Sequence, residues 1–118
     1  MIAILACGLA ACGPTRPPTD VLGVATRNLA AARSAGAASY APDEFRAAEQ
    51  HLSQANAASA RQDYDDAATL AGQSAVDSEL AAARTRLAKA REAAANLREQ
   101  NAELERDAAR HSDGGASQ

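Results

Sequence analysis

The sequence predicts an all-α protein, in which an N-terminal helix precedes a helical hairpin and a long C-terminal helix continues as a coiled coil. Ala, Leu, Glu, Gln and Arg dominate the chain of 118 residues, and all of them favour helix. Isoleucine occurs only at Ile2 and Ile4 and valine is sparse, so the β-branched signal of strands is nearly absent. Apolar residues then recur at three- and four-residue intervals, which is the period of an amphipathic helix.

The composition predicts a thin core. Hydrophobic residues make up 47% of the chain, but Ala supplies most of them. Such a core gains stability from a partner or from self-association. The net charge of −3 is spread along the chain and aromatic residues make up only 3%, so we expect no nucleic-acid partner.

The first residues predict a lipoprotein signal peptide over 1–11. Ile2–Ala11 is apolar but too short to span a bilayer, which matches the core of a secretory signal. Leu9-Ala10-Ala11-Cys12 resembles the bacterial lipobox. That resemblance implies cleavage after Ala11 and acylation of Cys12, which makes membrane lipid a partner. No Lys or Arg precedes Arg16, so either the true start lies upstream or the signal is atypical. The alternative is a buried helix over 1–12 with two free thiols.

Residues 12–18 predict a lipidated, extended tether, because Gly13-Pro14 and Pro17-Pro18 disfavour helix and strand. By the same resemblance, Gly13 after the cysteine favours the outer membrane over the inner one. We therefore expect a protein anchored by lipid in the cell outer membrane and facing the periplasm.

A helical hairpin domain is expected over 19–75. A first helix over Thr19–Ala35, capped by Thr19 or Asp20, stops at Gly36, and 37–41 form a short link. Its inner face is the set Leu22, Ala25, Leu29 and Ala32. Pro42 suits the first position of a second helix, which ends near Arg61-Gln62. The inner face of that helix is the set Phe45, Ala48, Leu52, Ala55 and Ser59.

A third helix is predicted from a cap at Asp63 to about Arg110, followed by a disordered tail over 111–118. It should pair antiparallel with the second helix, while the first covers the open side. Phe45 and Tyr64 are expected at the ends of this seam, with Leu52, Leu70 and Val76 in its middle. The Ala-rich pair around Asp63-Tyr64 resembles half of a tetratricopeptide repeat, although an array needs about three repeats.

The distal part of the third helix, 76–110, predicts a coiled-coil arm. The expected seam is formed by Val76, Leu80, Leu87, Leu97, Asn101 and Leu104. Asn101 occupies an a position, where Asn fixes the register of dimers. Arg86 would face Arg91 of a parallel partner and repel it. The seam could therefore self-associate in parallel or antiparallel, pair with another envelope protein, or stay partly solvated.

No catalytic residues, metal ligands or cofactors are predicted. His51 and His111 are far apart in sequence and are interpreted as residues on helix faces. Asp63, Asp65 and Asp66 match the positive start of a helix better than a cation loop. We expect neither an enzyme nor a small-molecule substrate.

Residues 20–90 resemble a family of small proteobacterial lipoproteins that carry a helical domain of unknown function. The resemblance rests on Tyr40-Ala41-Pro42 at a helix start and on Asp63-Tyr64 at a turn. Some relatives carry an OmpA-like domain after it. The resemblance implies an envelope location and supplies no reaction. The expected function is a structural or adaptor role through helix–helix contacts in the periplasm. The alternative is a tetratricopeptide-like module that binds a periplasmic client protein.

Overall fold

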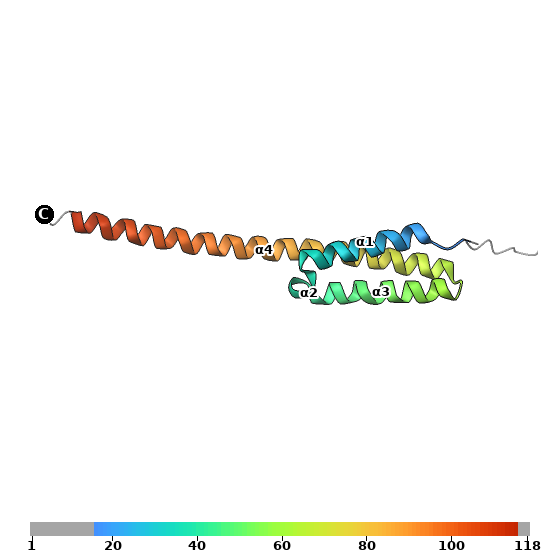
Figure 1. Cartoon of the computed structure of the whole chain (residues 1–118). Coiled ribbons are helices and arrows are strands. Elements are labelled where there is room, and N and C mark those ends of the chain that lie inside the picture. The colour runs from blue at the N-terminus through green and yellow to red at the C-terminus, as the bar shows by residue number, and fades with distance from the viewer. Residues whose placement is uncertain (1–15, 116–118) are drawn as a thin grey trace, which may run out of the picture.

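The computed structural model describes residues 16–115, which form a body of packed helices from which one helix projects as a long arm (Figure 1). The elements are α1 (Thr19–Ala35), α2 (Ala37–Tyr40), α3 (Pro42–Ala60) and α4 (Tyr64–Gly115). α1 and α4 run in the same direction, and α3 lies antiparallel to both (Figure 1). Within the described range every regular element is helical, which confirms the predicted all-α class with its long C-terminal helix.

The first helix has the predicted bounds, and a backbone feature ends it. Gly36 adopts a left-handed conformation with φ of 96°, and its N–H donates to the carbonyl oxygens of Ala32 and Arg33. Glycine tolerates this conformation without steric cost. Lys89 of α4 adds a second cap, because its Nζ donates to the Ala35 carbonyl oxygen at 2.6 Å. No side chain caps the start of α1, so the expected cap by Thr19 or Asp20 is wrong.

The segment expected as a plain link contains the one-turn helix α2. The N–H of Ala41 donates to the Ala37 carbonyl oxygen at 2.8 Å, and both alanines are buried. Their small side chains allow the turn to lie directly against the core, so the chain coils tightly instead of extending. Pro42 then occupies the start of α3 as predicted, and acidic Asp43 and Glu44 lie in its first turn.

The turn between α3 and α4 is short, with Gln62 at φ of 66° and the Asp63 carboxylate accepting from Arg61 Nε at 3.1 Å. α4 begins at Tyr64 and continues for 52 residues to Gly115. Residues 111–115, expected in a disordered tail, are therefore helical. Once a helix is nucleated each further residue adds a hydrogen bond, so a long helix continues through a stretch that would not nucleate one. Residues 116–118 lie outside the described part of the chain.

The core consists of two clusters in which α1 and α3 supply most of the bulky side chains, and α4 supplies small ones and Leu70. The first cluster contains Leu29, Ala32, Ala37, Ala41, Phe45, Ala48 and Ala81, with Leu52 packed against it. The second contains Ala25, Ala55 and Ala71, with Leu22, Leu52 and Leu70 packed against it. The predicted inner faces of the first two helices are thus the packed faces. Val76, expected in the middle of the interface between α3 and α4, is 65% exposed, so that expectation is wrong.

Candidate functional site

α4 carries two heptad patterns on opposite faces. The buried face consists of small side chains that alternate between four- and three-residue spacing: Ala67, Ala71, Ser74, Ser78, Ala81 and Thr85. The aliphatic stripe, as we call the other set, consists of Val76, Leu80, Leu87, Leu97 and Leu104. At about 100° per residue, the centres of the two sets lie roughly half a turn apart around the helix axis. The body therefore packs on one face of α4 and leaves the other uncovered.

The buried hydroxyls of α4 are all occupied within the fold. Ser74 Oγ donates across the interface to the Ala48 carbonyl oxygen of α3 at 2.8 Å. Ser78 Oγ and Thr85 Oγ1 donate along α4 to the carbonyl oxygens of Ser74 and Ala81. Ser74 therefore links α4 to α3, and Ser78 and Thr85 can be buried because each donor has a partner within α4.

The aliphatic stripe exposes large apolar side chains along most of α4. Leu80 is 43% exposed in the body, and Leu97 and Leu104 are 59% and 65% exposed in the arm. Asn101, the predicted register residue, lies between the last two and is also exposed. A lone exposed leucine on a protein surface is ordinary, whereas several large aliphatic residues at the a and d positions of one helix are typical of an interface.

The charged residues beside the stripe are directed toward α1 and α3. On one side, Asp77 Oδ2 lies 2.6 Å from His51 Nδ1, and Arg84 forms an ion pair with Glu44. On the other side, Glu79 Oε1 accepts from Asn28 Nδ2 at 3.0 Å. Contacts inside the body therefore hold these charges away from the apolar row, and the row stays accessible between residues 76 and 87.

The body ends near Glu92, at a cluster formed by α2 and α4. Tyr40 donates its phenol hydrogen to Glu92 Oε2 at 3.0 Å, and Lys89 Nζ lies 5.3 Å from the centre of the Tyr40 ring. Beyond this point α4 continues alone in Figure 1. The 93–115 part, which we call the arm, is about 35 Å long at 1.5 Å per residue.

The Tyr40–Glu92 contact gives a pH-dependent signal for the join between body and arm. The hydrogen bond to the Glu92 carboxylate, and then the negative charge of that group, raise the pKa of Tyr40 above its usual 10.0. Because the folded state favours the neutral phenol, this stabilisation is complete below about pH 10 and is lost as the pH rises through the folded pKa.

We expect the tyrosinate absorbance of a Tyr64→Phe chain, which retains Tyr40, to appear at higher pH than that of a free phenol. Adding Glu92→Gln should bring the midpoint back toward 10.0. Glu99→Gln, one heptad further along the arm, serves as the matched control and should leave the midpoint unchanged. Equal midpoints in all three chains would show that α4 does not pack against α2 at this position.

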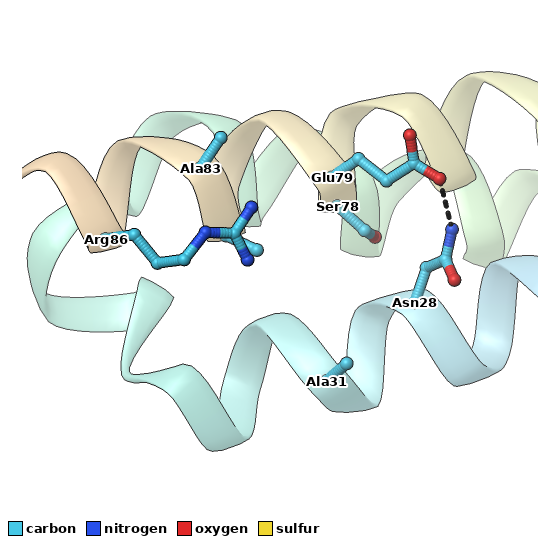
Figure 2. A pocket seen from close by; sticks show the side chains of 7 residues that line it. Asn28, Ala31, Ser78, Glu79, Ala83 and Arg86 are labelled. Carbon is cyan, nitrogen blue, oxygen red and sulfur yellow. Dashed lines mark hydrogen bonds between the residues drawn. The ribbon is translucent and has the colours of Figure 1, made fainter.

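The groove between α1 and α4 has a volume of about 480 Å³ (Figure 2). Asn28 and Ala31 line it from α1, and Ser78, Glu79, Ala82, Ala83 and Arg86 line it from α4. Figure 2 shows the Arg86 guanidinium lying over this groove. The Asn28 and Glu79 side chains bond to each other rather than converging on its centre. The groove holds no arrangement of nucleophile, base and oxyanion donor.

A second hollow of about 440 Å³ is lined by His51, Gly72, Gln73, Val76 and Asp77. Its His51–Asp77 pair links α3 to α4, so His51 acts as a packing residue of a helix face, as interpreted from the sequence. His111 Nδ1 lies 2.9 Å from the Asp107 carbonyl oxygen of its own helix. Among residues 16–115, no cluster of three or more His, Cys, Asp or Glu side chains could hold a metal ion.

The predicted lipidation residue Cys12 and the cleavage residue Ala11 lie outside the described residues. Of the helices that the structure describes, none combines the length and the apolar character needed to cross a bilayer. The seam residues Val76 to Leu104 are brought onto one uncovered face. Small Ala and Ser residues were expected where the hairpin helices meet, but Ser74, Ser78 and Thr85 were not predicted individually, although their four–three spacing with Ala67, Ala71 and Ala81 is a detectable signal.

Comparison with known proteins gives one match. The model of DUF4398, described as a domain of unknown function, matches residues 21–97. This range covers the body and the first residues of the arm, and it extends just past the Tyr40–Glu92 contact. No curated protein and no solved structure matches the chain. The chain belongs to the DUF4398 family, whose domain here is a bundle built on the N-terminal half of a long helix.

Proposed function

We propose that the protein is a lipid-anchored component of the bacterial cell envelope with a structural or adaptor role, carried out through helix–helix contacts. The observation that carries the proposal is the aliphatic stripe, which runs along the face of α4 that the body leaves uncovered. A helix that leaves such a row in water gains stability when another helix covers it.

The proposed anchor is Cys12, which follows Leu9-Ala10-Ala11 in the lipobox-like sequence. One acyl chain gives only marginal membrane binding, so stable attachment needs more than one chain on this residue. The six residues between Cys12 and Thr19 allow at most about 25 Å between the Cα atoms of those two residues when the segment is extended. Attachment would therefore hold the start of α1 close to the lipid. The arm would point away from it, because the arm leaves the opposite end of the body (Figure 1).

The proposed location is the outer membrane, with the body in the periplasm, because Gly13 rather than Asp follows the cysteine. The proposed role is not catalytic. The occupied hydroxyls of Ser74, Ser78 and Thr85 and the paired His51 and Asp77 support this, since each serves the packing of α4.

The proposal is tested by Cys12→Ser in the full chain, expressed in a Gram-negative host. We expect loss of acyl labelling, retention of the uncleaved precursor, and loss of the mature species from the membrane fraction. The matched control is Cys7→Ser, which changes the other cysteine of the same segment and should leave labelling and fractionation unchanged. Normal processing and labelling of the Cys12→Ser chain would refute the proposed anchor.

A further inference from the structure

We infer that the aliphatic stripe binds the same stripe of a second copy of this chain, so that two α4 helices pair in parallel and in register. The inference deepens the proposed role by naming the helix that covers the stripe. It uses only described residues of α4 and does not depend on Cys12.

The shape of the stripe favours parallel pairing in register. Parallel pairing in register places each leucine of the stripe against its own counterpart, and the intervening seam positions are Ala83, Ala90 and Ala94. Leucine layers then fill the seam where the side chains are large, and alanine layers let the backbones approach where they are small. α1 and α3 pack on the buried face of α4, and within the body Leu80 and Leu87 of the stripe stay 43% and 50% exposed.

Asn101 decides the relative orientation of the two α4 helices. In a parallel pair the two Asn101 amides face each other and can hydrogen-bond across the seam. In the antiparallel register that matches leucine with leucine, Leu80 faces Leu104 and Leu87 faces Leu97. Asn101 then faces Ala83, which offers its amide no partner. A buried amide without a partner is costly, so the parallel arrangement is favoured.

The position of Arg86 in the structure reduces the main electrostatic objection to parallel pairing. From sequence, Arg86 beside the seam would face and repel Arg91 of the second copy. In the structure the Arg86 guanidinium lies over the groove between α1 and α4 (Figure 2). Arg84 and Asp77, on the other side of the stripe, are held by Glu44 and His51 of α3. Three charged residues that flank the seam in the body, Arg84, Asp77 and Arg86, are thus drawn toward α1 or α3, which leaves Arg91 as an exposed charge beside it.

The inference is tested by disulfide crosslinking of the full chain in unfractionated cell lysate under mild oxidation, so that the chain is assayed whether or not it is attached to a membrane. Ala108→Cys lies on the seam near the end of the arm and keeps every leucine of the stripe. Two parallel copies bring these two positions within the distance of about 4.4–6.8 Å between Cα atoms that a disulfide requires. We expect a disulfide-linked dimer for Ala108→Cys and only background for the neighbouring Ala109→Cys, which lies off the seam. The unsubstituted chain measures any contribution of Cys7 and Cys12.

The contribution of the stripe leucines to pairing is tested in the Ala108→Cys chain. Leu97→Ala together with Leu104→Ala should strongly reduce the Ala108→Cys dimer, because the two leucine layers next to this position are lost. Equal crosslinking at positions 108 and 109 would overturn the inference. An Ala108→Cys dimer that Leu97→Ala and Leu104→Ala leave unchanged would also overturn it. Crosslinking of Ala108→Cys only to a co-expressed Val76→Cys chain would also overturn it, because that pairing is antiparallel. A dimer whose Cys12 carries no lipid would refute the proposed anchor and leave this inference standing.

Discussion

Replacing Phe45 by Ala is expected to lower the free energy of unfolding by about 3–5 kcal/mol, which is the usual cost of removing a buried aromatic ring. Phe45 is the only phenylalanine of the chain and is 6% exposed. Its neighbours in the cluster are Leu29 and a set of alanines, which are too small to fill the space that the ring leaves. Small domains are stable by only about 5–15 kcal/mol, so this one change would leave the body marginal or unfolded.

The measurement is urea unfolding followed by circular dichroism. Val24→Ala is the matched control, because Val24 lies on the outer side of α1 and is 39% exposed. We expect that control to shift the unfolding free energy by no more than about 0.5 kcal/mol. If Phe45→Ala costs no more than Val24→Ala, the cluster around Phe45 is not the core of the body.

Enlarging a small residue on the buried face of α4 should be almost as damaging. Ala81 is 0% exposed and lies in the cluster that also contains Ala32 and Ala48. Ala81→Leu inserts three carbon atoms where α1 and α3 approach α4 closely. We expect a loss of about 1–3 kcal/mol, because overpacking forces side chains off their preferred rotamers and shifts the backbone.

Ala95→Leu provides the control on the same helix. Ala95 lies two heptads beyond Ala81 on the same face of α4, but it is exposed because the body ends near Glu92. The substitution adds the same atoms and has the same helix propensity effect, so it should leave the stability nearly unchanged. A comparable loss for both variants would contradict the assignment of the small-residue face as the packed face.

The end of α1 and the start of α3 were predictable because local chemistry determines them. Gly36 ends α1 and Pro42 begins α3, and both residues act through their own backbone geometry rather than through distant contacts. The inner faces of α1 and α3 were equally clear, since each helix has one row that contains its large apolar residues. The helical turn at Ala37–Tyr40 was not predictable in this way, because it depends on buried alanines packing against the rest of the body.

Val76 is the residue of α4 that the sequence pattern placed wrongly, and the cause is physical. Large aliphatic residues usually indicate the buried face, which made Val76 a candidate for the middle of the hairpin. α1 and α3 already contribute Leu29, Phe45 and Leu52, so the centre of the face that α4 presents to them is formed by small side chains such as Ala71, with Leu70 at its side. Because α1 and α3 fill this space, the large side chains of the stripe lie on the other face of α4, where another helix can cover them.

The proposed location of the protein at a membrane depends on the lipid anchor. The mass of the native chain tests this anchor most directly. The protein purified from the envelope of its host in detergent should lack residues 1–11. It should begin at Cys12 and carry the added mass of its acyl chains. A chain that retains Met1 and carries no acyl mass would contradict the account.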